Sequence, residues 1–398
     1  MKKFTFLFTY LFILLVTSNI NAQWVQVSNG MGNRESVSFT YSGNNLFTGT
    51  YGYGIYLSTN NGTSWTQTSL NNLNVLALAA NGSYIFAGTN GVYLSTNNGI
   101  NWVQIFYNYH NIVSLAVNGN NIFAAGDNGN GIYLSTNNGT SWTQCFSSLG
   151  SVNSLAISGN IIFAGTVWTG VYLSTNNGSN WSQTSLNNCT VWSLAASGSK
   201  IFAGTYLHGV YLSTDNGTTL TQTSLMEDVS SLLLNGNNIY AGVDAGSGRG
   251  VYVSCDNGAN WTQRNEGLGY TSVSALCILN NYIFAATWGY SVWRRPLSEL
   301  IGIKPVGISV SENYYLSQNY PNPFNPITRI YFDIPKSTFT KLIIYDILGR
   351  ELATLVNQQL KPGSYEVEFD GSNLSSGVYF YKLVAGDYIN TKKMVLVK

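Results

Sequence analysis

The sequence has 398 residues, of which 9% are charged, 14% are aromatic and 41 are glycine. With 18 basic and 17 acidic residues the formal net charge is +1, so no basic excess suggests a nucleic-acid partner. This aromatic, glycine-rich composition is typical of an all-β protein rich in turns.

The first 22 residues have the organisation of a secretory signal peptide. Lys2 and Lys3 precede a nearly apolar run over residues 4–17, and residues 20–22 (INA) end in the small residue that a cleavage site needs. The apolar run of about 14 residues is shorter than the roughly 20 that a membrane-spanning helix requires, and no later run approaches that length. We therefore expect cleavage before Gln23 and export of the remaining chain.

After this segment the chain repeats one short motif six times. The motif first occurs at residues 56–65 (YLSTNNGTSW), and its later copies occupy residues 93–102, 133–142, 172–181, 211–220 and 252–261. The copies end 37 to 41 residues apart, with no helical pattern between them. A repeat of about 39 residues without helices indicates one β-rich unit that occurs many times.

Each repeat has the parts of a four-stranded sheet. In the second repeat, residues 75–80 (VLALAA) and 84–89 (YIFAGT) predict two apolar strands. Residues 92–95 (VYLS) predict a third strand and residues 102–104 (WVQ) a short fourth one. Asn-Gly turns join them, because both residues accept positive φ. Four short strands joined in this way predict one blade of a β-propeller.

The number of blades follows from the strand sets. Seven sets begin near Ser36, Val75, Val113, Val152, Val191, Val229 and Val273. The seventh set has only three strands, whereas residues 24–26 (WVQ) match residues 65–67 (WTQ) but lack three preceding strands. We therefore predict a closed seven-bladed propeller over residues 23–297, in which the N-terminal strand completes the last blade and hides both sheet edges.

The repeated motif resembles the Asp-box, or bacterial neuraminidase repeat, with the pattern Ser-x-Asp-x-Gly-x-x-Trp. Four copies carry asparagine in place of the aspartate: Asn60, Asn97, Asn137 and Asn176. Asp215 and Asp256 keep the acid, and Leu220 replaces the tryptophan of the fifth copy. A short side-chain oxygen can still accept bonds from the turn, and glycine permits its left-handed step. The resemblance implies a propeller with the boxes on the face opposite the ligand site, and it implies no activity.

The chain offers no evident cofactor or metal site. His110 and His208 are two blades or more apart and have no cysteine partners. Residues 215–217 (DNG) lack the ligand spacing of a calcium loop. We therefore expect neither a metal nor a cofactor.

The four cysteines do not form a disulfide framework. Cys277 takes the place that alanine has on other first strands, which predicts a small core residue. Cys145 and Cys189 follow the fourth strands of consecutive blades, and export permits disulfides. They are the pair most compatible with a disulfide, and unpaired thiols are the alternative.

A change in charge density marks a second domain. Residues 23–297 contain six basic and eight acidic residues, whereas the much shorter stretch 314–398 contains nine and seven. The intervening residues 298–313, which include Gly302, Pro305 and Gly307, suit a linker. Alternation along residues 378–384 and turns near residues 361–363 and 369–371 predict a small Ig-like β-sandwich over residues 314–398.

Four blocks of the tail occur in a recognisable order: residues 318–326 (QNYPNPFNP), 342–351 (LIIYDILGRE), 374–383 (LSSGVYFYKL) and 392–398 (KKMVLVK). Together they are similar to the type A C-terminal sorting domain of the type IX secretion system. An ordinary adhesion or spacer domain is the alternative, but it would not need the basic, apolar terminal strand. The sorting signal would then include Lys392, Lys393 and Lys398.

The resemblance of the tail implies a route and a set of partners. The protein would lose its signal peptide, cross the periplasm of a diderm bacterium and pass the outer membrane through the type IX machinery. A C-terminal signal peptidase would then remove the tail, and the propeller would be released or attached to surface lipopolysaccharide. We therefore expect a secreted or outer-membrane cell-surface protein.

Blade geometry divides the loops between two faces. Connections from second to third strands and from fourth strands to the next blade share one face, here named the loop face. The boxes lie on the other, the box face. Aromatic and charged residues gather in the loop face, which favours it as the ligand site. The candidate ligand-binding residues are Tyr51, Trp168, Tyr206, His208, Asp244, Arg249 and Trp288. Alternatively, the aromatic residues only plug the central funnel or pack between loops.

Three classes of function fit a propeller of this kind. The first is a non-catalytic secreted or cell-surface module that binds a glycan or a protein. The second is a secreted glycoside hydrolase similar to sialidases or xyloglucanases, which also carry Asp-boxes. The third is an assembly factor like the Asp-box propellers that help to build photosystems. The outer-membrane sorting tail argues against this class, because it implies a different destination.

The short repeats argue against an enzyme. Sialidase chemistry needs three arginines for a carboxylate, and Arg34, Arg249 and Arg264 are available near the loop face. Repeats of about 39 residues, however, leave connections too short for long catalytic loops, and xyloglucanases typically join two propellers. A binding module is therefore the leading interpretation.

Overall fold

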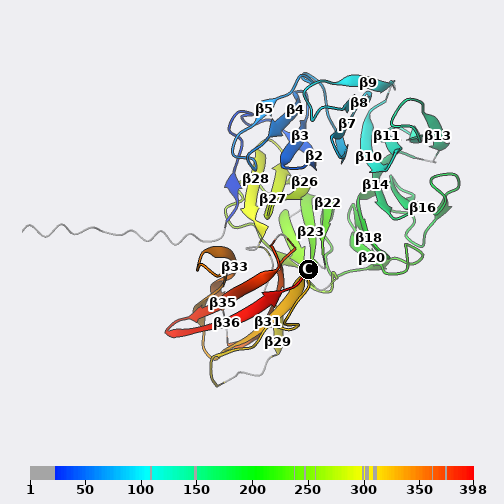
Figure 1. Ribbon diagram of the computed structural model, residues 1–398. Helices are drawn as coiled ribbons and strands as arrows, with labels where there is room; N and C mark the ends of the chain where they lie inside the picture. The colour runs from blue at the N-terminus through cyan, green and yellow to red at the C-terminus, as the bar shows by residue number, and fades with distance from the viewer. Residues whose placement is uncertain are drawn as a thin grey trace, which may run out of the picture.

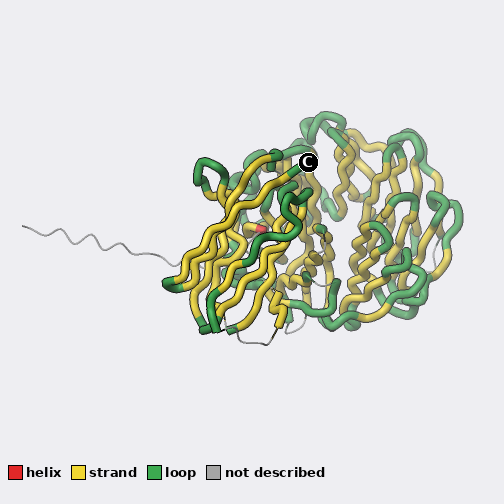
Figure 2. The backbone as a smooth tube through the Cα atoms, turned by 60° about the horizontal axis from the view of Figure 1, so that its bottom comes forward, coloured by secondary structure: helices red, strands yellow, loops and turns green. Residues whose placement is uncertain are grey.

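The computed structural model describes residues 23–107, 110–147, 150–236, 238–245, 248–255, 257–297, 300, 304–307, 312–360, 362–372 and 374–398. The predicted signal peptide, residues 1–22, lies outside the described residues. The described part of the chain consists of strands and loops with one short 3-10 turn at Leu297 and no α-helix, and Figure 2 shows a small helical segment among the strands. It accordingly contains no helix with the length and apolar character needed to cross a membrane.

Seven four-stranded antiparallel sheets surround a common centre and form the propeller (Figure 1). The first blade consists of β2 (Ser36–Ser42), β3 (Asn45–Thr50), β4 (Gly54–Ser58) and β5 (Thr66–Gln67), hydrogen-bonded in that order. The second and third blades consist of β6 (Ala77–Asn81), β7 (Tyr84–Thr89), β8 (Gly91–Ser95), β9 (Val103–Tyr107), β10 (Ile112–Asn118), β11 (Asn121–Gly126), β12 (Gly131–Ser135) and β13 (Thr143–Phe146). The fourth to sixth consist of β14 (Val152–Ser158), β15 (Ile161–Thr166), β16 (Gly170–Ser174), β17 (Ser182–Gln183), β18 (Val191–Ser197), β19 (Lys200–Thr205), β20 (Gly209–Ser213), β21 (Thr221–Gln222), β22 (Asp228–Asn235), β23 (Asn238–Ala245), β24 (Gly250–Ser254) and β25 (Thr262–Gln263).

The seventh blade is assembled from both ends of the propeller. It consists of β26 (Val273–Leu279), β27 (Tyr282–Thr287), β28 (Ser291–Pro296) and β1 (Val25–Gln26). β1 is antiparallel to β28, with Val25 opposite Arg294 and Gln26 opposite Trp293. First strands of neighbouring blades contact one another all the way round, including β26 and β2. The predicted closed seven-bladed propeller is confirmed.

Each box forms a compact turn held by its own side chains. In the first box the Ser58 hydroxyl accepts the Gly62 N–H at 2.8 Å, and the Asn60 Oδ1 accepts the Ser64 N–H at 2.9 Å. Asn61, between them, has a left-handed φ of 55°. Asn60 therefore accepts the hydrogen bond that the aspartate of the family motif would accept in this turn.

An aromatic ring on the second strand packs between consecutive blades. The seven rings are fully buried and belong to Phe47, Phe86, Phe123, Phe163, Phe202, Tyr240 and Phe284. A Cβ atom at Gly99 would lie 2.6 Å from the Phe47 ring, and one at Gly217 would lie 2.6 Å from the Phe163 ring. Glycine is therefore needed in these boxes for space as well as for φ.

The seventh blade has no box, and the segment after β28 covers its place. The Leu297 N–H donates to the Asn281 carbonyl at 2.8 Å, as the Asn216 N–H of a true box donates to Ser199 at 3.0 Å. Leu300 is fully buried in the same cluster as Tyr240. Residues that follow the last strand thus complete the propeller core.

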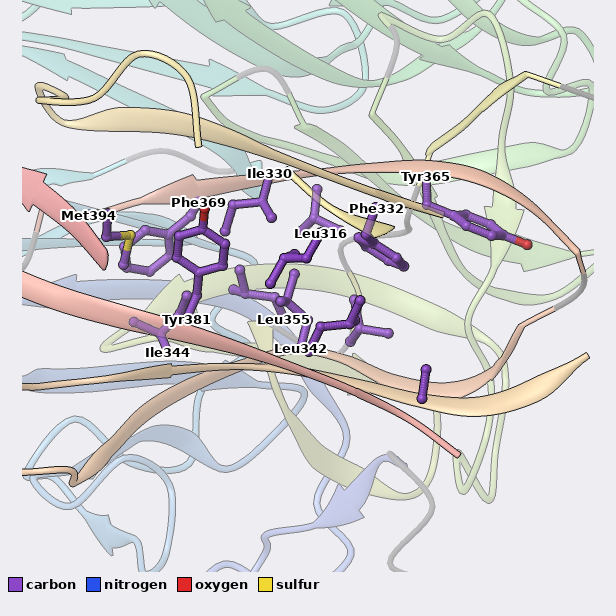
Figure 3. Packing of buried hydrophobic residues seen from close by; sticks show 14 of the residues in the cluster. Leu316, Ile330, Phe332, Leu342, Ile344, Leu355, Tyr365, Phe369, Tyr381 and Met394 are labelled. Carbon is purple, nitrogen blue, oxygen red and sulfur yellow. The ribbon is translucent and has the colours of Figure 1, made fainter. Parts of the chain in front are cut away.

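The C-terminal unit is a sandwich of two four-stranded sheets. Their strands are β29 (Lys304–Gly307), β34 (Gly363–Asp370), β31 (Ile327–Ile334) and β30 (Tyr315–Leu316) in one sheet, and β33 (Glu351–Leu360), β32 (Thr338–Tyr345), β35 (Gly377–Ala385) and β36 (Tyr388–Leu396) in the other. Figure 3 shows buried side chains such as Phe332, Leu342 and Tyr381 between the sheets. Residues 304–307 fall within the predicted linker but pair with β34, so the sheet begins before residue 314.

All four cysteines are free thiols. Cys145 packs at the junction of the third and fourth blades, and Cys189 packs at the junction of the fourth and fifth. Burial raises the pKa of both thiols to about 11 and that of Cys277 to about 12. They therefore remain protonated at neutral pH and act as small apolar residues.

Candidate functional site

A repeated hydrogen bond fixes the turns at the loop face. The side-chain amide of Gln67, on the fourth strand, donates to the carbonyl of Tyr53 in the turn before β4 at 2.7 Å. Equivalent bonds join Gln26 to Tyr290, Gln144 to Asn130, Gln183 to Thr169, Gln222 to His208 and Gln263 to Arg249. The turns that carry the candidate residues are thus tied to the outer strand of their own blade.

Two of these turns contain a bulky residue in the left-handed region. Trp168 has a φ of 67° and Leu207 a φ of 64°, and their side chains are 68% and 63% exposed. The corresponding positions of the first and seventh blades are Gly52, with φ 83°, and Gly289, with φ 76°. A left-handed L-residue costs roughly 1–2 kcal/mol. Such strain is characteristic of functional sites.

The strained turns lie beside each other in the fourth and fifth blades. The Thr190 hydroxyl accepts the Trp168 N–H at 3.2 Å, and the Thr190 carbonyl accepts the Tyr206 N–H at 3.0 Å. The Tyr206 ring packs on Trp192, with ring centroids 5.1 Å apart. We name the apolar surface formed by Trp168, Trp192, Tyr206, Leu207 and Met226 the blade 4–5 patch.

Within this patch, Met226 comes from the segment that connects the fifth blade to the sixth. It is 60% exposed, and its Cα atom lies 2.6 Å from where a Cβ on Gly209 would stand. Two residues further along, the Asp228 carboxylate accepts the Leu207 N–H. The connection after β21 is therefore packed against the strained turn.

A second aromatic group lies in the seventh and first blades. Tyr270 and Tyr290 stack with centroids 5.0 Å apart, and Trp288 is 46% exposed. In the first blade the Arg34 guanidinium lies 3.7 Å above the centroid of the Tyr53 ring. Stacking therefore covers part of the aromatic surface in these two blades.

The candidate residues are spread round the loop face and do not form one constellation. Trp168 and Tyr206 are brought together through Thr190, and the Nδ1 atom of His208 lies 2.9 Å from the Tyr206 carbonyl. Tyr51 and Trp288 belong to the first and seventh blades. Asp244 and Arg249 flank the turn of the sixth, where the Asp244 carboxylate accepts the Ser272 hydroxyl. Their role in binding stays a prediction.

Sequence reasoning missed Leu207 and Met226 because neither is aromatic or charged. Alignment of the repeats would have found Leu207, since it takes the place of Gly52 and Gly289. Met226 could not be found in this way, because its exposure depends on the path of the connecting segment.

The loop face also carries an excess of negative charge. Its loops hold five carboxylates outside the Arg264 region, namely Glu35, Asp127, Glu227, Asp228 and Asp244, and two arginines, Arg34 and Arg249. Within the described part of the chain no salt bridge involves any of the five carboxylates. Asp127, for example, accepts both its bonds from Asn111, at 3.1 and 3.0 Å. Asp228 is buried and one oxygen of Glu35 is enclosed, so the charge left for solvent or for a ligand is that of the remaining carboxylates.

The three arginines considered for a sialidase do not meet at the mouth. The Arg264 carbonyl accepts the Trp24 indole N–H at 2.7 Å. Burial has the largest effect on the pKa of the Arg264 guanidinium and lowers it. The charge of Glu266 raises this pKa, and the charge of Arg295 lowers it. Glu266 itself pairs with the buried Arg295 at 2.7 Å. The Arg264 side chain is half-buried beside Glu266, Arg295 and Cys255, with its Nε atom enclosed, and no contact brings it to Arg34 or Arg249 in the described residues.

Among the residues that the structure describes, no group of three or more His, Cys, Asp or Glu side chains could hold a metal ion.

In the tail, the first and last of the four sequence blocks form one unit. The Phe324 N–H donates to the Val395 carbonyl at 2.9 Å, and the Val397 N–H donates back to Phe324 at 3.0 Å. The side chain of Gln318 donates to the carbonyl of Lys393 at 2.7 Å. The terminal strand β36 is thus held between β35 and the block at residues 318–326.

The three lysines of the proposed sorting signal differ in their contacts. Lys392 lies opposite Tyr381 and Lys393 lies opposite Phe380 in the β35–β36 pair. The Lys398 ammonium donates to the Ser372 carbonyl at 2.6 Å. Lys392 and Lys393 lie on β36 and Lys398 follows its end, and the side chains of Lys393 and Lys398 are exposed.

Comparison with known proteins agrees with both domains. Residues 318–398 match the family described as secretion system C-terminal sorting domain. No curated protein matches the sequence. The tail is a type IX sorting domain, and the chain is accordingly a secreted or cell-surface protein that engages the type IX secretion machinery.

Solved structures similar to the chain are propellers. YCF48 from Cyanidioschyzon merolae has a TM-score of 0.55 at 13% identity, and covers 69% of this chain and 98% of its own. YCF48 bound to D1 peptide has a TM-score of 0.54 at 12% identity, with 69% and 96% covered. The GH74 enzyme of Niastella koreensis has a TM-score of 0.51 at 19% identity, with 66% and 43% covered. At these identities the likeness shows the fold alone.

Proposed function

We propose that this protein is a non-catalytic binding module that captures a glycan or a protein through the loop face of its propeller after type IX export. The observation that carries the proposal is the exposure of Trp168 and Leu207 in left-handed turns where other blades have glycine. Both side chains cost conformational free energy and bury little surface in return. A ligand that covers them would supply the missing burial.

The surroundings of the two turns support a binding role. Glutamine bonds to the turn carbonyls and the Thr190 bridge hold the tips rigidly, so little entropy is lost when a ligand binds. Exposed tryptophan is among the side chains that contribute most to binding interfaces. The similar YCF48 structure with a bound peptide indicates that a propeller of this fold can accept a ligand of that kind.

A glycoside hydrolase remains the alternative, and the geometry favours it less. The turns between second and third strands are three residues long in the first, fourth and fifth blades, namely residues 51–53, 167–169 and 206–208. Turns of this length cannot carry catalytic groups far over a substrate. The half-buried Arg264, whose enclosed Nε atom lies near Glu266 and Arg295, is also poorly placed to serve as one of the three arginines that a sialidase-like site would need.

The test compares the full chain with a Trp168→Gly, Leu207→Gly double variant. A glycan array and a displayed library of short random peptides serve as probes. We expect the double variant to bind at least one captured ligand at least about tenfold more weakly than the unchanged chain does. The melting temperature should stay level or rise, because glycine relieves the left-handed strain.

The matched control is Ile100→Gly, which removes an equally exposed apolar side chain, 67% exposed, from the box face. It should leave capture unchanged. If every captured ligand binds the double variant as tightly as the unchanged protein, or is lost only from the control, the loop face is not the binding site.

A further inference from the structure

We infer that the ligand of the loop face is a basic, amphipathic polypeptide segment that lies across the fourth to sixth blades. This inference rests on the proposed function and narrows it to one class of partner. It follows from the composition of the blade 4–5 patch and from the charge beside it.

The apolar part of the patch suits amino-acid side chains better than sugars. A sugar ring stacks on a flat aromatic surface, which Trp168 offers, but Leu207 and Met226 offer none. Leu207 lies in the turn at residues 206–208 and Met226 packs beside the end of this turn, and they are 63% and 60% exposed, so apolar surface continues past the tryptophan. Methionine is over-represented at adaptable protein-binding surfaces, and aromatic residues are enriched in interface cores.

Negative charge borders the patch on the side of the sixth blade. The Asp228 carboxylate is bonded to the Leu207 N–H. The neighbouring Glu227 carboxylate packs against the backbone of Gly248, where an added Cβ would collide with it. Asp244, one residue before the end of β23, instead accepts the Ser272 hydroxyl from the connection to the seventh blade. The Glu227 and Asp228 carboxylates therefore lie along one border of an exposed apolar surface.

Charge complementarity selects the partner. Five carboxylates face two arginines in these loops, and none of the five is paired with a cation in the described residues. Sialosides, uronic-acid polymers and phosphate-bearing ligands carry like charge and would be repelled. A peptide with Lys or Arg beside Leu, Ile or Phe would place its cations over the carboxylates and its apolar side chains on Trp168, Leu207 and Met226.

The test selects short random peptides, displayed on phage, on the immobilised full chain, and measures synthetic copies of enriched peptides by fluorescence anisotropy. We expect enriched sequences to combine Lys or Arg with apolar residues and to bind more weakly as salt rises. Peptides with Glu in place of every Lys or Arg should not bind.

Two loop-face variants and one matched control locate the contacts. Trp168→Gly should weaken binding at least about tenfold. Glu227→Gln should weaken it about threefold, the size expected for a partly exposed ion pair. Asp215→Asn removes an acid from the box face without changing the loop face and should have no effect. Melting temperatures of all variants are measured in parallel, so that loss of fold is recognised.

The outcomes separate this inference from the proposed function. Enriched peptides without basic residues, or equal binding by all variants, would overturn the inference. If a neutral glycan is instead captured and Trp168→Gly loses it, the inference is wrong and the proposed binding function stands. If no peptide or glycan depends on Trp168 or Glu227, both are wrong.

Discussion

The ring of Phe284 in the seventh blade lies directly under the backbone of Gly62 in the box of the first blade. A Cβ atom at Gly62 would stand 2.9 Å from the ring. The Phe47–Gly99 and Phe163–Gly217 contacts have the same form between blades that are consecutive in the chain. The junction that closes the ring therefore uses the packing of an ordinary junction.

This contact predicts that Gly62→Ala destabilises the propeller by about 3 kcal/mol, from left-handed strain and overpacking together. Gly82→Ala is the matched control, because Gly82 has a φ of 60° but no atom within 4 Å of an added Cβ. It should lose only about 1 kcal/mol. Chemical denaturation measures both values, and equal losses would show that the Phe284 contact contributes nothing.

Ring closure by β1 makes a second prediction. Deletion of residues 23–28 would leave β28 as an exposed edge and remove Trp24, whose side chain is 2% exposed. We expect a lower melting temperature and aggregation in size-exclusion chromatography. Trp24→Ala alone should cost about 3–5 kcal/mol. Trp168→Ala, an exposed tryptophan, is the control. Monomeric elution with an unchanged melting temperature would refute closure by this strand.

The fifth box predicts a pH dependence. The pKa of Asp215 is lowered to about 2, because the N–H and hydroxyl of Thr219 and the hydroxyl of Ser213 donate to its carboxylate. Since the unfolded pKa is about 3.9, this stabilisation is complete above that pH and is lost as the pH falls through about 2.

The Asp215→Asn variant should therefore have the same melting temperature as the unchanged protein near pH 2. At neutral pH its melting temperature should be lower. Asn60→Asp should add the same pH dependence to the first box, whose bonds are equivalent. Melting temperatures recorded from pH 2 to pH 7 test both variants. A constant difference between Asp215→Asn and the unchanged protein at every pH would contradict the assignment.

The sorting tail needs a test that leaves its fold intact. Met394 and Leu396 of β36 are 0% and 1% exposed, so deletion of residues 392–398 would unfold the sandwich as well as remove the signal. A triple change of Lys392, Lys393 and Lys398 to Gln keeps these core residues. We expect the triple variant to accumulate in the periplasm of a host with the secretion machinery.

Lys341→Gln is the control for this experiment, because Lys341 is exposed on β32 and lies outside the terminal strand. Its export should be normal. Fractionation and surface labelling measure the distribution of each variant. Equal surface display of the triple variant and the control would show that the three lysines are not part of the signal.

The fold could be predicted from the sequence because its determinants are local and repeated. Asn-Gly turns, box serines and the Trp-x-Gln strands occur in nearly every repeat, and the match of residues 24–26 to residues 65–67 revealed the closing strand. Burial of Tyr379, Tyr381 and Leu383 also follows the alternation read from the tail.

The site could be predicted only in part, for physical reasons that differ between residues. Trp168 was found because it is aromatic in a turn, but its left-handed backbone emerges only from comparison with Gly52 and Gly289. The position of Arg264 could not be read from the sequence, because the segment after β25 follows a path set by Trp24 and Arg295 from distant parts of the chain. Strand β29 was missed because pairing with β34 is non-local.

Closure of the seventh blade also sets the order of folding events. Because Val25 pairs with Arg294, the first strand of the propeller has no partner until almost the whole domain is available. Contacts of such large sequence separation raise the contact order and slow folding. The propeller therefore reaches its native state only once the last blade is available for pairing. Any peptide fused ahead of Trp24 would emerge at the edge of that last blade.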